Sequence, residues 1–144
     1  MTLIERLIYA RRGPLRVFVK QILALHGIEC PPEVEIGVGL RIYHRAFGTV
    51  IHPSTVIGDN VRIYHGVTVG RADVWSAGRS ITMEAIHIGD GAILCAGATV
   101  ICKTGILTIG AGSIIGANSV LTKSTGANEI WAGSPARLVG MRTT

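Results

Sequence analysis

The chain has 144 residues and a mass of 15.2 kDa, which is enough for one hydrophobic core and too little for two ordinary domains. Apolar residues make up 48% of it and charged residues only 16%, which excludes an intrinsically disordered chain. The formal net charge of +5 suits an anionic partner. However, the basic residues beyond the first sixteen positions are scattered without interleaved aromatic residues, so no nucleic-acid partner is expected.

Cysteine usage indicates a reducing compartment. The three cysteines, Cys30, Cys95 and Cys102, are an odd number and form no Cys-x-x-Cys pair, which argues against a disulfide framework. The first residues carry charge within their apolar run and lack a small-residue cleavage site, so they do not resemble a signal peptide. We therefore expect a cytoplasmic protein.

Residues 1–27 have the apolar spacing of helices. Apolar residues recur there every three or four positions, and Gly13-Pro14 interrupts the pattern, which predicts two short helices. We expect this segment to cap the end of a second domain, residues 28–144. The alternative is contact with a membrane surface through a basic amphipathic helix, which is possible but not expected.

A repeat of six residues dominates the rest of the chain. Aliphatic residues occupy every sixth position in three runs: Ile51, Ile57, Ile63, Val69; Ile88, Leu94, Val100; and Ile109, Ile115, Leu121. A period of six fits short strands joined by tight corners, with one aliphatic side chain of each strand pointing inward. The sequence therefore predicts a mainly β protein, a parallel β-helix with three sides to a coil of roughly eighteen residues. Residues 34–135 would supply about five such coils.

Four stretches in this order carry a resemblance to a known family. They are Gly-Leu-Arg-Ile-Tyr-His at 39–44, Val-Ile-Gly-Asp-Asn-Val at 56–61, Val-Thr-Val-Gly at 67–70 and Ala-Gly-Ser-Pro-Ala-Arg-Leu-Val-Gly at 132–140. From about residue 28 to residue 140 the chain resembles the left-handed β-helix, hexapeptide-repeat acyltransferases. Within them it is most similar to the serine acetyltransferases and the related O-acetyltransferases of surface-polysaccharide pathways. The resemblance implies left-handed coils, a homotrimer and acetyl-CoA bound between adjacent subunits.

Acetyl transfer from a thioester to a hydroxyl group needs a base for the hydroxyl proton, and histidine suits that role. The resemblance places His44 at the family's catalytic histidine and Glu29 where the family has an aspartate that orients the imidazole. Direct transfer with no acyl-enzyme and no metal is implied. As alternatives, His44 is an ordinary surface histidine and Glu29 a solvated carboxylate, in which case His65 is the best substitute base.

The resemblance also implies where the co-substrate acetyl-CoA binds. Gly70, Ala96 and Ala117 match positions at which the pantetheine arm approaches the backbone closely. Each of them has an equally good structural reason to be small. Arg71, Lys123 and Arg137 are candidates for contact with the phosphates, with an ordinary solvated surface as the alternative for each.

The acceptor is expected to be a small molecule, L-serine or a sugar. The Arg-His-Pro motif that serine acetyltransferases place beside the site is missing from residues 71–80. Arg79 would replace it in part, and Trp75 would stack on a sugar or cover a neighbouring subunit.

Two other functions are compatible with a β-helix. A non-catalytic assembly scaffold would bind no coenzyme. A γ-class carbonic anhydrase would bind zinc through three histidines from two subunits. Successive intervals of 8, 13 and 22 residues separate His44, His52, His65 and His87, and these do not match that pattern.

Overall fold

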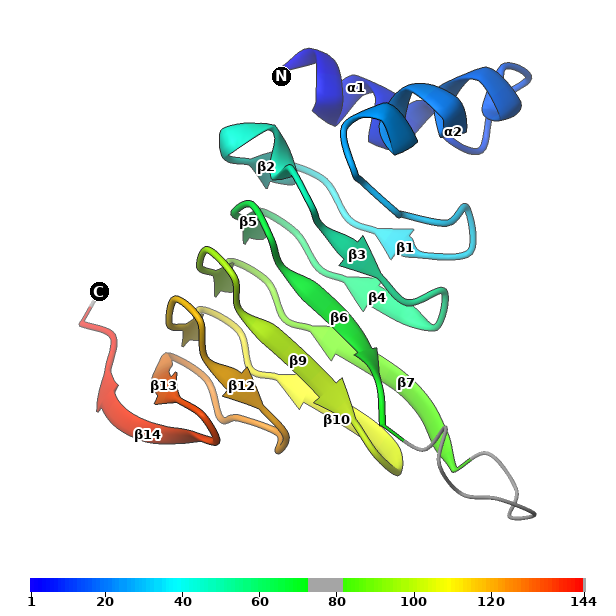
Figure 1. Cartoon of the computed structure of the whole chain (residues 1–144). Helices are drawn as coiled ribbons and strands as arrows, with labels where there is room; N and C mark the ends of the chain where they lie inside the picture. Colours follow the sequence, from blue (N-terminus) through cyan, green and yellow to red (C-terminus); the bar gives the residue numbers. More distant parts are fainter. Residues whose placement is uncertain (73–81, 144) are drawn as a thin grey trace.

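The computed structural model describes residues 1–72 and 82–143, so Trp75 and Arg79 lie outside the described residues. Two helices, α1 (Leu3–Ala10) and α2 (Arg16–Leu25), precede a stack of short strands (Figure 1). Gly13 and Pro14 lie between the two helices, as the interrupted apolar spacing predicts. No helix in the described ranges is long and apolar enough to cross a membrane.

The strands form the three faces of a parallel β-helix (Figure 1). The first face contains β1 (Glu35–Ile36), β4 (Thr55–Ile57), β7 (Met83–Ile88) and β10 (Gly105–Ile109). The second contains β2 (Arg41–Ile42), β5 (Arg62–Ile63), β8 (Ile93–Leu94), β11 (Ile114–Ile115), β13 (Glu129–Gly133) and β14 (Ala136–Met141). The third contains β3 (Val50–Ile51), β6 (Thr68–Arg71), β9 (Thr99–Cys102) and β12 (Val120–Leu121). The predicted parallel β-helix is thereby confirmed.

The described part of the chain makes four complete coils, β1–β3, β4–β6, β7–β9 and β10–β12, and a partial fifth. The fifth coil stops at β13, because β14 turns back and pairs with β13 in the antiparallel direction. Where about five coils were expected, the structure has four full coils and a partial fifth that ends in this hairpin.

The aliphatic residues of the six-residue repeat form the core. Ile57 pairs in register with Ile88, Ile63 with Leu94, and Val69 with Val100. All six of these side chains are buried. Each coil therefore places an aliphatic side chain above its counterpart in the next coil. The core consists of columns of stacked aliphatic side chains.

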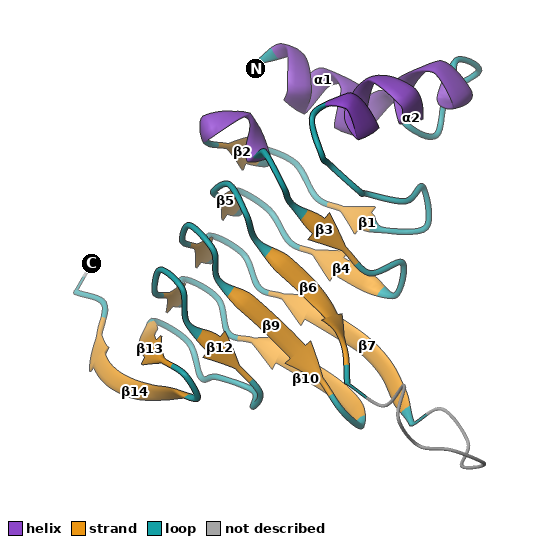
Figure 2. Ribbon diagram, in the orientation of Figure 1, coloured by secondary structure: helices purple, strands orange, loops and turns teal. Residues whose placement is uncertain are grey.

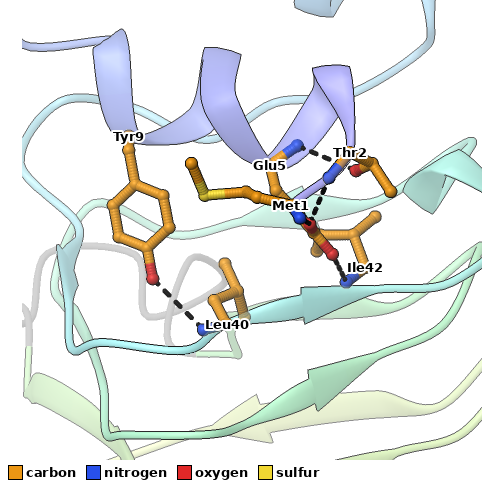
Figure 3. A network of polar contacts seen from close by, with 6 residues as sticks. All are labelled: Met1, Thr2, Glu5, Tyr9, Leu40 and Ile42. Atoms are coloured by element: carbon orange, nitrogen blue, oxygen red, sulfur yellow. Dashed lines mark hydrogen bonds and ion pairs between the residues drawn. The ribbon is translucent and has the colours of Figure 1, made fainter.

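Helices α1 and α2 cover the N-terminal end of the coil stack (Figure 2). The Glu5 carboxylate accepts a hydrogen bond of 2.9 Å from the backbone N–H of Ile42 in β2. The Tyr9 hydroxyl accepts from the N–H of Leu40 at 3.1 Å (Figure 3). It also donates to the carbonyl of Gly37 at 2.7 Å. These bonds satisfy backbone groups that the first coil would otherwise expose at an open edge.

Arg11 continues this closure from the end of α1. Its guanidinium donates to the carbonyl oxygens of Ile8 at 2.7 Å and Pro31 at 3.1 Å, and also to that of Val34. The side chain is buried, and burial lowers the pKa of Arg11. The helices and the first coil are thus bonded to each other, and a division into domains 1–27 and 28–144 stays a prediction.

Candidate active site

One corner of the coil carries the candidate catalytic histidine. Segments 43–49, 64–67, 95–98 and 116–119 each join the second face to the third, and we call them together the histidine corner. Backbone hydrogen bonds join neighbouring segments: Gly66 N–H to Phe47 O at 2.8 Å, Gly97 N–H to His65 O at 3.0 Å, and Asn118 N–H to Ala96 O at 2.9 Å. The strand register that leads into these segments places His44, His65, Ala96 and Ala117 at equivalent positions of successive coils.

The backbone at His44 is strained. His44, Arg45 and Ala46 form a single short turn with φ values of 51°, 59° and 48°, in the left-handed region that non-glycine residues rarely occupy. Such residues cost about 1–3 kcal/mol each and are concentrated at functional sites. Two hydrogen bonds of 3.0 Å hold the turn, from Ala46 N–H to Tyr43 O and from Thr49 N–H to Ala46 O. The Ala46 side chain is buried beneath it.

Four aromatic rings lie together beside this turn. The rings of Tyr43 and Tyr64 are stacked, with centroids 4.6 Å apart and planes inclined by 11°. The His44 ring lies 6.1 Å from the Tyr64 ring and 5.2 Å from the His65 ring, and it meets the latter edge to face at 88°. Both histidine side chains are exposed and both tyrosines are half-buried. His44 is therefore accessible to an acceptor while its ring is flanked by other rings.

Sequence reasoning missed this cluster of rings, although a signal for it was present. The tripeptide Ile-Tyr-His occurs twice, at 42–44 and at 63–65, and the two copies lie in register in β2 and β5 with their following residues. A repeat that returns after one full coil must stack upon itself, so its two Tyr-His pairs come together at one corner.

Glu29 lies at the edge of the third face. Its N–H donates to Thr49 O at 2.9 Å and its carbonyl accepts from Ile51 N–H at 2.8 Å, so its backbone pairs with β3. Its exposed side chain lines a cavity of about 780 Å³ beside α2, together with Arg16 and Lys20. Within residues 1–72 and 82–143, no hydrogen bond joins the Glu29 carboxylate to His44, and their pairing stays a prediction.

The residues expected to bind acetyl-CoA fall into three places. Ala96, half-buried, and Ala117, exposed, lie on the histidine corner with His44. Gly70 and Arg71 lie in β6 of the third face, opposite Ile101 and Cys102 of β9, and the exposed Lys123 follows β12 of the same face. Arg137 is exposed on β14, at the end of the second face. The structure thus groups the two alanines with the histidines, places Arg71 and Lys123 on the third face, and places Arg137 on the second face.

Two of the three cysteines have thiols whose ionisation is disfavoured by burial. Burial raises the pKa of the Cys30 thiol, and it also raises the pKa of the Cys95 thiol. A raised pKa disfavours the thiolate, which is the nucleophilic form.

The carbonic anhydrase alternative would need a zinc site made by histidines of two subunits. In the part of the chain that the structure describes, no three histidine, cysteine or carboxylate side chains are grouped so that they would hold a metal ion. His87 lies in β7 of the first face, whereas His44 and His65 lie on the histidine corner.

Comparison with known proteins identifies relatives but no matching family model. Serine acetyltransferase 4 of Arabidopsis thaliana is 37% identical over 120 residues, which cover 83% of this chain and 31% of that protein. The crystal structure of serine acetyltransferase from Brucella abortus strain S19 matches with a TM-score of 0.74 at 28% identity, over 95% of this chain and 54% of that one. Its complex with coenzyme A matches with a TM-score of 0.71, also at 28% identity, over 97% of this chain and 54% of that one.

Two conclusions follow from these similarities. The chain spans about a third to a half of the length of these relatives. The shared fold also confirms the left-handed β-helix that the hexapeptide resemblance predicted.

Proposed function

We propose that this chain, which belongs to the serine acetyltransferase branch of the hexapeptide-repeat acyltransferases, transfers the acetyl group of acetyl-CoA to the hydroxyl group of L-serine. The observation that carries the proposal is the composition of the histidine corner. An exposed histidine in a strained turn lies at one end of it, and the small residues Ala96 and Ala117 lie further along. The proposed base and two of the residues proposed to line the path of the pantetheine arm thus lie on the histidine corner.

The proposed mechanism uses His44 as the general base. A ring nitrogen of His44 takes the proton of the acceptor hydroxyl while the hydroxyl oxygen attacks the thioester carbonyl. The new C–O bond forms, the C–S bond breaks, and His44 returns the proton to the departing thiolate. The products are an O-acetyl ester and free coenzyme A. Glu29 is the proposed orienting carboxylate, which would favour the charged imidazolium that forms in this step.

Acetyl-CoA is the proposed co-substrate, and one solved relative is a complex with coenzyme A. Gly70, Ala96 and Ala117 are proposed to admit the pantetheine arm, and Arg71, Lys123 and Arg137 to meet the phosphates. These residues lie on the third face, on the second face and on the histidine corner between those faces. A homotrimer with the site between adjacent subunits would bring different faces together, and we propose that assembly.

A sugar hydroxyl is the second candidate acceptor. The stacked rings of Tyr43 and Tyr64 beside His44 favour it, because an aromatic surface accepts the apolar face of a sugar ring.

The cysteines of the described chain are free thiols, which is consistent with the proposed cytoplasmic location.

Release of free thiol from acetyl-CoA tests the proposed function. The purified protein is incubated with acetyl-CoA and L-serine, with a panel of simple pyranosides, or with L-alanine, which lacks the hydroxyl group and serves as the control. We expect thiol release with L-serine and none above background with L-alanine. Thiol release only with pyranosides would show that the acceptor is a sugar hydroxyl and not L-serine. No release with any acceptor and no binding of acetyl-CoA would favour the scaffold alternative.

A further inference from the structure

The His65 ring contacts the ring of His44, the candidate base, in the neighbouring coil. The His44 and His65 ring centroids are 5.2 Å apart and the ring planes are inclined by 88°. This is the edge-to-face arrangement, in which the positive edge of one ring faces the negative face of the other. The contact is between two exposed side chains, so burial does not impose it.

The backbone around His65 is held more firmly than its exposure suggests. The His65 carbonyl accepts a hydrogen bond of 3.0 Å from Gly97 N–H, and Gly66 N–H donates to Phe47 O at 2.8 Å. The first bond ties His65 to the following coil and the second ties its neighbour to the turn that carries His44. Backbone hydrogen bonds between successive coils therefore connect the segments that carry the two histidines.

The His44 ring needs a partner of this kind. An imidazole on a free side chain rotates broadly about its terminal torsion, because that torsion has no deep staggered wells. Among residues 1–72 and 82–143, no hydrogen bond to the His44 ring is present, and its ring contacts are with His65 and Tyr64. Tyr64 is itself stacked on Tyr43. Within the described chain, the ring contacts of His44 are thus all made by rings of the next coil.

We propose that His65 is a positioning residue for His44, an inference that rests on the proposed function. The edge-to-face contact limits rotation of the His44 imidazole and keeps one ring nitrogen directed to the place where the acceptor hydroxyl arrives. His65 acts through His44, beside Glu29, and takes no proton from the acceptor. Catalysis is sensitive to such alignment, because a small misplacement of a base lowers the rate of the chemical step.

Three variants separate positioning from proton transfer. His65→Leu removes the ring, His65→Phe keeps an aromatic ring without nitrogen, and His87→Leu removes a histidine from the first face as a matched control. We expect His65→Leu to lower kcat about two- to ten-fold, the range that the loss of an aromatic pair produces, with little change in the KM for acetyl-CoA. His65→Phe and His87→Leu should stay near the wild-type kcat.

A double variant tests whether His65 acts through His44. In a His44→Ala background, His65→Leu should produce no further loss, since residues that work as one unit are not additive. A His65→Phe variant as impaired as His65→Leu would overturn the proposal, because the ring nitrogens of His65 would then be needed. An unchanged kcat in His65→Leu would overturn it as well.

NMR of the histidine rings gives a readout that does not depend on activity. The Cε1–H resonance of His44, assigned through His44→Ala, should shift in His65→Leu because the ring current of His65 is lost, and it should stay unshifted in His87→Leu. An unshifted His44 resonance in His65→Leu would show that the contact is absent and would overturn the proposal. Wild-type protein that releases no thiol with any acceptor overturns instead the proposed function, and the NMR result then still decides whether the contact exists.

Discussion

The ring of Tyr43 lies flat on the ring of Tyr64, one coil further along the β-helix, with the two centroids 4.6 Å apart. The pair joins the strained turn at His44 to the more regular corner at His65. Replacing either tyrosine by leucine should lower the free energy of unfolding, because the stacking contribution and part of the buried ring area are lost. We expect about 0.5–1.5 kcal/mol from stacking alone, measured by urea denaturation. Tyr64→Phe keeps the ring and should lose little of this stability; a loss equal to that of Tyr64→Leu would contradict a role for stacking.

The Glu5 carboxylate should make an ionisation-dependent contribution to stability. Burial opposes its ionisation, but hydrogen bonds from the backbone N–H groups of Ile42 and Thr2 favour it, and the net pKa is below the ordinary value of 4.5. A group with a lowered pKa stabilises the folded state above the unfolded pKa. This stability is lost as the pH falls from about 4.5 through the lower folded pKa.

Glu5→Ala leaves the N–H of Ile42 without its acceptor and removes the capping box of α1. We expect a loss of about 1–3 kcal/mol at neutral pH, measured by denaturant unfolding. Glu5→Gln retains an acceptor oxygen but no charge. Its stability should change less between pH 6 and pH 3 than that of the wild type, and an identical pH dependence would count against the contribution of the carboxylate.

Ala117→Leu should weaken the binding of acetyl-CoA without unfolding the protein. Ala117 is exposed on the histidine corner, so a larger side chain projects over the proposed path of the pantetheine arm rather than into the core. Ala111→Leu is the matched control, since Ala111 is an exposed corner alanine between the first and second faces. We expect a raised KM for acetyl-CoA in Ala117→Leu and an unchanged one in Ala111→Leu. Equal values in the two variants would place the coenzyme elsewhere.

The regular part of the fold could be predicted because one aliphatic residue per strand suffices to define it. Ile57, Ile63 and Val69 mark three successive faces, and their partners Ile88, Leu94 and Val100 mark the same faces in the next coil. A six-residue period has few other structural explanations. The three-sided parallel coil followed from this spacing, whereas the antiparallel last strand β14 did not.

The irregular part could not be predicted in the same way. Arg45 and Ala46 carry no preference for left-handed backbone, so nothing local predicts the strained turn at His44. The hydrogen bonds of the Glu5, Tyr9 and Arg11 side chains are made to backbone groups of distant residues. Every residue has such groups, so the sequence does not indicate which of them will be the partners. The roles of His44 and Glu29 came from resemblance to a family and stay predictions.

The activity of His44→Ala tests the central claim most directly. A positioned general base contributes about 10²–10⁴-fold to the rate, so His44→Ala should lower the kcat for thiol release from acetyl-CoA by roughly that factor. The KM for acetyl-CoA should barely change, and Glu29→Gln should lose less activity than His44→Ala. Near-wild-type turnover in His44→Ala, together with loss of turnover in His65→Ala, would contradict the account and place the base one coil further along the histidine corner.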